Sequence, residues 1–318
     1  MELEEIHAVW YRSPEAYDMP AELSPVERQH CTREVKYGLG GVLASLPALW
    51  VNHPSRLADC AYKPVQLARA HEYGLSVPDT VITNEPDTVR SFAAGGQTIT
   101  KLMGANTISE EGRRKLSWTR VLGRDELDDL RGFSVTSHLV QRWVPKLFEV
   151  RIVVIADQLT AVKIISGSAA SHIDWRSDYA ALTYDLIEPP DHVTHSVRAL
   201  MRSFDLVYAA LDLIVTPDAE WVFLEINAGG QYGWLEAKTG VPLTVDGVSG
   251  RRSHEGKAVT TSLDTGWAPR AQRLADLLAE RGDLRNPAWK DAVVAVARHV
   301  LVPAAYRQDN TGAWHSVT

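Results

Sequence analysis

The sequence predicts an α/β protein of the α+β kind, with helices and strands along its first 240 residues and a short helical tail after them. Three observations support this: a strong helix-start motif near residue 24, a β-rich hairpin over 150–164, and a second, acidic hairpin over 207–226. A chain of 318 residues can bury one large core or two or three smaller ones.

The first helix is expected from Ser24, which can cap it, through Pro25 at its first position and Glu27 in a capping box, to Gly38. The runs 150–155 and 159–164 read as a hairpin that turns at Asp157-Gln158. Further helices are expected over 64–74, after Pro86, and over 192–204, and further strands over 80–83, 97–101, 137–143, 207–215 and 221–226.

Two stretches lack such periodicity. Residues 104–132 are polar and punctuated by glycine, which predicts a mobile segment. Residues 241–264 are rich in Gly, Ser, Thr and charge, which indicates a linker. Two helices are expected beyond it, over 269–281 and 287–300.

Composition excludes several classes of protein. A hydrophobic fraction of 45% and a charged fraction of 23% are typical of a globular protein. The net charge of −7, with both signs interleaved, argues against a nucleic-acid partner. Cys31 and Cys60 form no metal-spaced pair, which fits a reducing compartment. The acidic start is unlike a signal peptide, and the longest apolar stretch, 38–51, is too short to cross a bilayer. We therefore expect a cytoplasmic protein without a membrane partner.

The acidic hairpin carries the sharpest chemical signal. If its turn is centred between Asp218 and Ala219, Asp212 lies directly across from Glu225, and such neighbours are about 4.5–5.5 Å apart at Cβ. Asn227 lies two residues beyond Glu225 and so projects from the same face. Facing carboxylates repel each other, whereas a hard cation such as Mg²⁺ binds oxygen ligands of this kind.

A solvated hairpin face with incidental acids is the alternative. The register places five aliphatic residues on the other face and puts Trp221 and Phe223 beside the acids, so the acidic face is expected to be partly covered. The five are Leu211, Leu213, Val222, Leu224 and Ile226. Partial cover favours a metal site at Asp212, Glu225 and Asn227.

These residues also carry a family resemblance. Asp212, Glu225-Ile-Asn227 and the following Ala-Gly-Gly-Gln-Tyr resemble the metal-binding end of ATP-grasp ligases. The resemblance continues upstream, over roughly residues 50–240, through Tyr62-Lys63-Pro-Val-Gln, the strand-end Lys101, Gln141-Arg-Trp-Val-Pro145 and Glu149-Val-Arg151. It implies an ATP-grasp fold with a small N-terminal domain.

Within that superfamily, the chain most resembles the graspetide (microviridin-like) peptide maturases. The segment Gly167-Ser-Ala-Ala-Ser-His-Ile-Asp-Trp-Arg-Ser-Asp-Tyr179 and the opening Trp10-Tyr-Arg support this branch. Two departures stand out. Ala228 follows the metal asparagine where the family usually has proline, and Leu-Met-Gly-Ala-Asn after Lys101 is less rich in glycine than the usual phosphate cover.

The resemblance implies roles for individual residues. ATP would be bound by Lys63, Lys101, Gln141, Arg142, Trp143, Val144 and Arg151, with the backbone of 142–144 against adenine. Arg151, Lys101 and Arg176 would be catalytic, and Trp175, Arg176 and Asp178 would contact the peptide. Taken singly, Lys63, Lys101 and Arg151 could each be surface residues, Trp175 could be plain core, and Arg176 with Asp178 could form a surface ion pair.

The implied activity is a peptide ligation that uses ATP and Mg²⁺. An Asp or Glu side chain of a ribosomally made precursor peptide would be activated as an acyl phosphate and captured by a hydroxyl or an amine, giving an ester or amide macrocycle. The enzyme would recognise a leader segment of that precursor. A homodimer and a partner methyltransferase are further expectations. The alternatives are an ATP-grasp ligase that adds amino acids to a protein or joins small molecules, and a non-catalytic leader-peptide-binding module.

The expected domains are 1–55 (pre-ATP-grasp), 56–145 (central), 146–240 (C-terminal, with the metal site), the linker 241–264, and 265–318. The last segment, with Gly266-Trp-Ala-Pro-Arg and Val296-Ala-Arg-His-Val-Leu-Val-Pro303, resembles the opening of protein-isoaspartate-type methyltransferases. It has no glycine-rich nucleotide-binding turn after a strand. We therefore expect a remnant without methyltransferase activity, and truncation near Ser262 should preserve cyclisation.

Overall fold

The computed structural model describes residues 6–11, 14, 17–104, 107–110, 113–116, 119–241, 272, 276, 280, 305–308 and 314–317. Internal contacts divide the chain into two compact units, residues 6–255 on the one hand and residues 1–5 with 256–318 on the other. Each unit is described by itself below.

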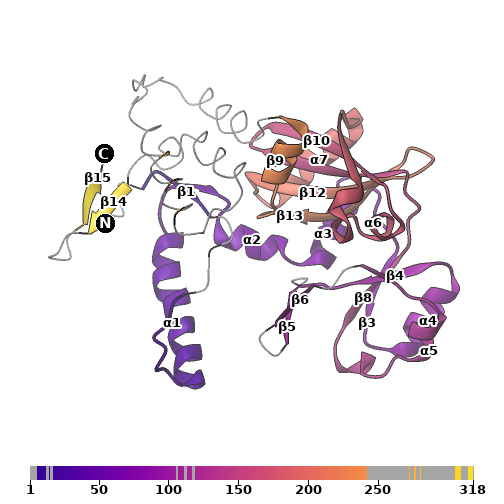
Figure 1. Ribbon diagram of the computed structural model, residues 1–318, viewed down its shortest axis with the longest axis horizontal. Coiled ribbons are helices and arrows are strands. Elements are labelled where there is room, and N and C mark those ends of the chain that lie inside the picture. The colour runs from indigo at the N-terminus through magenta and orange to yellow at the C-terminus, as the bar shows by residue number, and fades with distance from the viewer. Residues whose placement is uncertain are drawn as a thin grey trace. The chain divides into compact units, whose positions relative to one another are not determined.

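A five-stranded sheet in the order β11-β10-β9-β12-β13 is the centre of the larger unit, and its neighbouring strands are antiparallel (Figure 1). Its strands are β9 (Phe148–Ile155), β10 (Gln158–Ser166), β11 (Leu182–Ile187), β12 (Tyr208–Val215) and β13 (Trp221–Asn227). Both predicted hairpins are present. The sequence analysis missed β11, an edge strand whose Thr183 and Asp185 are exposed and weaken its apolar signal.

One face of this sheet packs against helices α3 (Lys63–Glu72) and α7 (Asp191–Ser203). The buried apolar residues of α7 recur at the spacing of one helical face, and they are Val193, Val197, Leu200 and Met201. They join Ile152, Leu211 and Phe223 of the sheet in the main core. Both helices were predicted; α3 ends just before Gly74, whose φ of 86° suits the residue after a helix.

The opposite face of the sheet has two parts. At one end, Val153, Ile155 and Tyr208 pack against Tyr232 and Leu235, the latter in α8 (Gly233–Thr239). At the other end the same face carries polar residues, and the short helix α6 (Ala169–Ile173) contacts β10 nearby. That polar end faces a second, smaller sheet, so the space between the two sheets is where a site can form.

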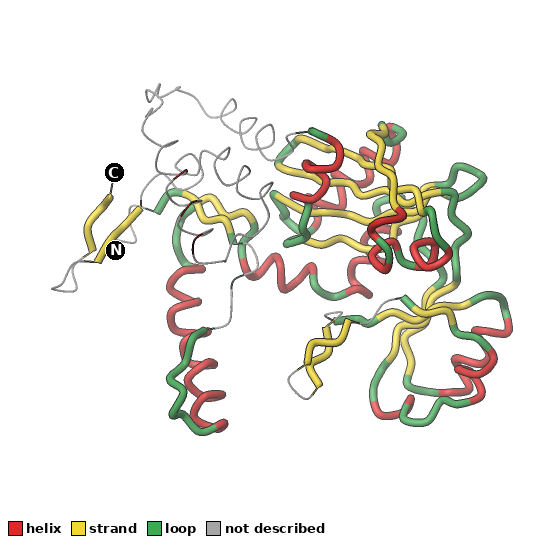
Figure 2. The backbone as a smooth tube through the Cα atoms, in the orientation of Figure 1, coloured by secondary structure: helices red, strands yellow, loops and turns green. Residues whose placement is uncertain are grey.

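The smaller sheet has the order β3-β8-β4-β7. Its strands are β3 (Thr80–Thr83), β8 (His138–Arg142), β4 (Thr98–Lys101) and β7 (Arg120–Val121), accompanied by α4 (Pro86–Ala94) and α5 (Arg124–Asp128) (Figure 2). The segment 104–132 was expected to be a mobile loop. Its described parts instead form the antiparallel pair β5 (Thr107–Glu110) and β6 (Arg113–Leu116), then β7 and α5. These elements are short and polar, so they leave little apolar periodicity in the sequence.

The N-terminal part comprises β1 (Ala8–Trp10), α1 (Pro25–Ala44), β2 (Leu49–Val51) and α2 (Pro54–Cys60), with β1 and β2 parallel. The predicted capping box of Ser24 and Glu27 is present. Helix α1 continues past Gly38, where its end was expected, because Gly38 does not adopt a positive φ.

In the smaller unit, β14 (Ala305–Gln308) and β15 (Trp314–Val317) form an antiparallel pair that was not predicted. Gln272, Asp276 and Glu280 are helical, as expected for the first tail helix. The linker beyond Val241, the helix expected over 287–300 and the methyltransferase-like motifs lie outside the described residues.

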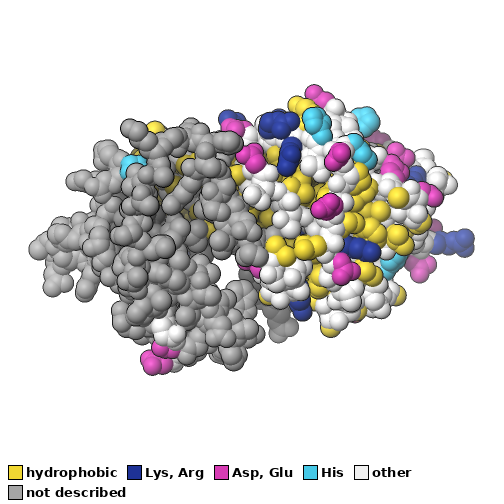
Figure 3. All heavy atoms as spheres, turned by 90° about the horizontal axis from the view of Figure 1, so that it is seen from above, with side chains coloured by type: hydrophobic (Ala, Val, Ile, Leu, Met, Phe, Trp, Pro, Cys, Tyr) yellow, Lys and Arg dark blue, Asp and Glu magenta, His cyan; other side chains and the backbone are white. Residues whose placement is uncertain are grey.

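Among the described helices, none has both the length and the apolar character that crossing a membrane requires. On the face drawn in Figure 3, the described surface intersperses acidic and basic side chains with apolar ones. The α+β prediction is confirmed by the arrangement of sheets and helices.

Candidate nucleotide and metal site

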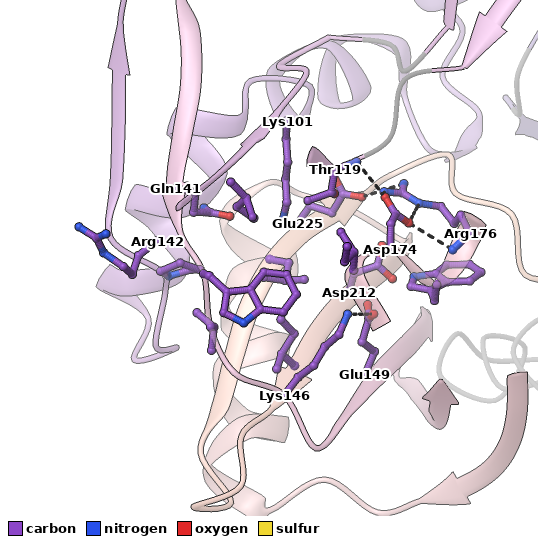
Figure 4. Close-up of a pocket in the computed structure, with 18 residues that line it drawn as sticks. Lys101, Thr119, Gln141, Arg142, Lys146, Glu149, Asp174, Arg176, Asp212 and Glu225 are labelled. Atoms are coloured by element: carbon purple, nitrogen blue, oxygen red, sulfur yellow. Dashed lines mark hydrogen bonds and ion pairs between the residues drawn. The ribbon is translucent and has the colours of Figure 1, made fainter. Parts of the chain in front are cut away.

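A cavity lies between the two sheets, and both contribute to its walls (Figure 4). The small sheet contributes Ile99, Lys101 and Gln141, and the large sheet contributes Glu149, Asp212, Ile214, Leu224 and Glu225. The connection 143–146, the segment 173–176, Pro78, Thr119 and Arg142 also contribute to the lining. Apolar and ionised side chains therefore share one cleft, as expected for a site that binds a base and its phosphates.

The predicted carboxylate pair is present in the predicted register. Asp212 pairs with Glu225 across β12 and β13, and Asn227 pairs with Ala210. A β-bulge follows Asp212, so that Leu213 pairs with Phe223 rather than with Leu224. The extra residue, Leu224, lines the cavity.

Because of the bulge, the side chains expected to cover the acidic face lie elsewhere. Trp221 and Phe223 were expected beside the acids, but both are buried in the main core with Leu211 and Leu213. One inserted residue reverses the face of every side chain beyond it, because strand side chains alternate with a period of two. The sequence pattern contains no signal for the bulge.

Both carboxylates are paired with cations. Arg151 Nη1 donates to both oxygens of Asp212, at 2.6 and 2.7 Å, and both side chains are 8% exposed. Lys63 Nζ donates to Glu225 Oε2, and Arg176 Nη1 lies 3.8 Å from Glu225 Oε1. Lys63 and Arg151 were predicted to contact phosphates, but here they hold the two predicted metal ligands.

The surroundings shift the pKa values of Glu225 and Asp212 in opposite directions. Burial raises the pKa of the Glu225 carboxyl, but the charges of Lys63, Arg176 and Lys101 outweigh it and hold that pKa well below its usual range. Burial raises the pKa of Asp212 above its ordinary value, with Arg151 acting against the shift. Glu225 is therefore the acid whose ionised form the site stabilises most.

The oxygen set fits a magnesium ion. Asn227 Nδ2 donates to Glu225 Oε1 at 3.4 Å, which orients the Asn227 Oδ1 away as a further oxygen donor. Within the described residues, no group of three or more His, Cys, Asp or Glu side chains could hold a metal. Magnesium does not need one, because it usually takes one or two carboxylates and completes its shell with water and phosphate oxygens.

Asp174 was missed by the sequence analysis. It accepts two hydrogen bonds from Arg176, Nε to Oδ1 and Nη2 to Oδ2, both at 2.9 Å. It also accepts the backbone N–H of Thr119 at 3.2 Å. This fork fixes the guanidinium of Arg176 beside Glu225 and ties the segment to the small sheet (Figure 4). The sequence does contain a signal for this contact, because Asp174 lies two residues before Arg176 at the start of a short 3-10 turn.

Trp175 and Asp178 have structural surroundings. Trp175 is 6% exposed and packs against Trp234, with ring centroids 5.1 Å apart. Asp178 accepts a hydrogen bond from Ser168 Oγ at 2.8 Å. Trp175 also lines the cavity, so a peptide contact by this residue stays a prediction; the side chain of Arg176 is 32% exposed and accessible.

Of the predicted adenine hinge, the side chain of Arg142 is turned away from the cavity (Figure 4). The N–H groups of Arg142 and Trp143 donate to Asp79 O and Gln97 O, so the remaining hinge donor in this described segment is the N–H of Val144. Gln141 is buried and donates to Thr80 Oγ1 at 2.9 Å.

A buried ion pair beside the hinge was also missed. Lys146 donates to Glu149 Oε1, and the two side chains are 4% and 7% exposed. Both line the cavity. Their spacing of three residues across a strand start gives no helical or hairpin signal, so the sequence pattern did not reveal the pair.

The Arg142 guanidinium caps the end of α4. It donates to Phe92 O at 2.8 Å, Gly96 O at 2.5 Å and Thr98 Oγ1 at 3.1 Å, and it lies 4.4 Å over the Phe92 ring. Arg142→Ala should therefore lower the free energy of unfolding by about 1.5–3 kcal/mol, as for lost charge-assisted bonds. Urea unfolding checks this. If the hinge contacts adenine only through its backbone, nucleotide affinity should change less than about twofold. A loss of about tenfold in the folded variant would instead show that the Arg142 side chain contacts the nucleotide.

Lys101 projects into the cavity from the end of β4 (Figure 4). Among the described residues no hydrogen bond or ion pair holds its ammonium group. Burial lowers the pKa of Lys101, although the charge of Glu225 acts to raise it. The Lys101 ammonium is thus available to bind an incoming anion such as a phosphate.

This environment predicts proton uptake on nucleotide binding. At alkaline pH, between the lowered pKa of Lys101 and its ordinary 10.5, the free protein holds Lys101 partly neutral. A bound phosphate raises that pKa, so the complex takes up a proton. Calorimetry of ATP binding in two buffers of different ionisation enthalpy measures the uptake. It should vanish in Lys101→Met; equal uptake in both proteins would contradict this role.

Comparisons with known proteins found a matching family model and similar solved structures. A family model described as "MvdD pre-ATP grasp domain" matches residues 1–58. No curated protein matches the chain. The macrocyclase MdnC from Microcystis aeruginosa MRC, solved with its precursor peptide MdnA, has a TM-score of 0.68 and 27% identity over 76% of each chain.

Two further solved structures are similar. A Chryseobacterium gregarium RiPP-associated ATP-grasp ligase, in complex with ADP and a leader and core peptide, has a TM-score of 0.67 and 29% identity, over 74% of this chain and 73% of that one. The ATP-grasp ligase PsnB, with minimal precursor, Mg and ADP, has a TM-score of 0.60 and 26% identity, over 76% and 77%.

Proposed function

We propose that this chain, which belongs to the ATP-grasp ligases, uses ATP to activate Asp or Glu side chains of a ribosomally made precursor peptide and joins them to hydroxyl or amine side chains as macrocyclic esters or amides. The solved relatives at 26–29% identity include a macrocyclase and two ligases bound to precursor peptides. ATP and Mg²⁺ are the proposed cofactors. We propose a cytoplasmic location, since ATP and newly made peptide are both found there.

One observation carries the proposal: a single cleft brings the Lys101 ammonium together with the carboxylates of Asp212 and Glu225, and Asn227 contacts Glu225. Phosphoryl transfer depends mainly on positioning the phosphates and neutralising their charge. A cation on one wall and magnesium-type ligands on the other meet that need across the cleft.

The residues would divide the task as follows. The apolar side chains of Ile214 and Leu224 would line the base, and Val144 N–H would donate to its edge. Lys101 would hold phosphate oxygens. When bound, magnesium would neutralise phosphate charge and favour departure of ADP.

The cations already in ion pairs would then have a second role. As the carboxylates of Asp212 and Glu225 turn to the metal, Arg151 and Lys63 would be released toward phosphate oxygens. Arg151 Nε is buried without a partner among the described residues, so this guanidinium has an unused donor beside its ion pair with Asp212. A planar guanidinium suits two phosphate oxygens at once.

Arg176 is proposed to act on the reacting carboxylate. Its fork with Asp174 leaves the guanidinium next to Glu225, at the part of the cleft away from the hinge. A fixed cation there would stabilise the negative charge that develops on an acyl phosphate. The leader segment is proposed to bind near the β9–β10 hairpin, which borders this region in the chain.

The reaction is tested with the product of a neighbouring small open reading frame rich in Thr and Asp/Glu. Enzyme, peptide, Mg²⁺ and ATP are mixed, and ADP release and peptide mass are followed together. The proposal expects peptide-dependent ADP release and loss of one water per ring. ADP release with a free amino acid but not with peptide would indicate small-molecule ligation, and peptide binding without ADP release would indicate a non-catalytic module.

A further inference from the structure

Near the end of β13, the outer edge of the strand contacts a side chain rather than another strand. β13 is the last strand of its sheet, so alternate backbone groups along it point away from β12. Near its start, Phe223 N–H donates to Ser76 O at 2.8 Å. At Ile226, the residue between Glu225 and Asn227, the partner is the carboxamide of Gln66.

The contact is a two-way pairing. Gln66 Oε1 accepts the N–H of Ile226 at 3.1 Å, and Gln66 Nε2 donates to the C=O of the same residue at 3.0 Å. Nε2 also donates to Cys60 O at 2.6 Å. Carbonyls only accept and an N–H only donates, so these partners fix which way the amide points.

Gln66 is built into the core. It is 4% exposed and lies on α3, which packs on the sheet. One turn earlier on the same helix, Lys63 pairs with the side chain of Glu225. Helix α3 therefore contacts the end of β13 at two points. Lys63 contacts the carboxylate of Glu225, and Gln66 contacts the backbone of Ile226.

Ala228, two residues after Ile226, is also held by a buried side chain. Asn52, 1% exposed, donates from Nδ2 to Ala228 O at 2.8 Å and to Tyr208 O at 2.6 Å. The segment 225–227 is thus fixed by buried amides at residue 226 and at residue 228. An edge strand without such contacts would be free to fray.

We propose that Gln66 is a positioning residue for the metal site, whose carboxamide substitutes for a neighbouring strand and sets the spacing of the Glu225 and Asn227 oxygens. This inference rests on the proposed function for the existence of the metal site. Gln66 would act through the backbone of Ile226, which it contacts, rather than as a metal ligand. Groups that orient metal ligands typically contribute about 10–100-fold to metal affinity or activity.

The test separates positioning from general stability. Mn²⁺ affinity is measured by calorimetry on the full chain in the presence of a saturating non-hydrolysable ATP analogue. Gln66→Met keeps the length and removes the hydrogen bonds; Gln66→Asn keeps the amide but is too short to reach both groups of Ile226. Val89→Ala, a buried change in α4, is the stability control.

Gln66→Met should bind Mn²⁺ about tenfold or more weakly, with Gln66→Asn weakened as well and analogue affinity without metal unchanged. Val89→Ala should lose stability but keep its Mn²⁺ affinity. If Gln66→Met does not fold, Gln66→Asn decides. Wild-type Mn²⁺ affinity in a folded Gln66 variant would overturn the inference alone, whereas no Mn²⁺ binding by the wild type would overturn the metal site and this inference with it.

Discussion

Replacing Glu225 with glutamine should lower ATP-dependent turnover by about a thousandfold. The change removes one of two charged oxygen ligands from the proposed magnesium site, and metal stabilisation of a transition state amounts to several kcal/mol, each ~1.4 kcal/mol being tenfold in rate. Lys63, which loses its partner, is 18% exposed and can reach water, so the fold should persist.

ADP release with peptide, together with circular dichroism, measures this effect. Glu188→Gln is the matched control, because it makes the same chemical change at an exposed position outside the cavity. Turnover within a few-fold of wild type in folded Glu225→Gln would show that magnesium is not held by this carboxylate.

Breaking the Arg151–Asp212 pair should cost stability as well as activity. Both side chains are buried, so Arg151→Met or Asp212→Asn alone leaves a buried charge uncompensated, at about 3–5 kcal/mol. Asp212→Asn should therefore destabilise the fold as well as remove a proposed metal ligand.

The double variant Arg151→Met with Asp212→Asn separates the two effects. It carries neither charge, so urea unfolding should show a loss of stability smaller than the sum of the two single losses, by a coupling of about 1–3 kcal/mol. Turnover should stay absent, because a proposed ligand and a proposed phosphate contact are both gone. Single variants as stable as wild type would argue that the pair is not buried in solution.

The sequence predicted those parts of the site that depend on local spacing. Asp212 and Glu225 face each other as expected, although the pairs next to the turn, such as Val215 with Trp221, lie one residue off the expected register. The bulge at Leu224 lies between the turn and that pair and shifts the register back by one residue, and no turn or glycine signal in the sequence predicts it. The predicted faces of Trp221 and Phe223 failed for that reason alone.

Contacts between distant segments were out of reach. Arg151 meets Asp212 because β9 and β12 are neighbours in the sheet, an order that no local pattern encodes. Gln66 pairs with Ile226 across 160 positions of chain. Its sequence neighbours predicted only a helix, so its role depends on where that helix packs.

The central claim is that a peptide carboxylate is activated by ATP before it is joined. The direct measurement uses precursor peptide labelled with ¹⁸O in its Asp and Glu side chains and reads the inorganic phosphate released during cyclisation by mass spectrometry. An acyl phosphate passes one carboxylate oxygen to phosphate when the hydroxyl or amine attacks the acyl carbon. We expect one ¹⁸O in the phosphate for each labelled ring formed. Unlabelled phosphate released alongside cyclised peptide would contradict it.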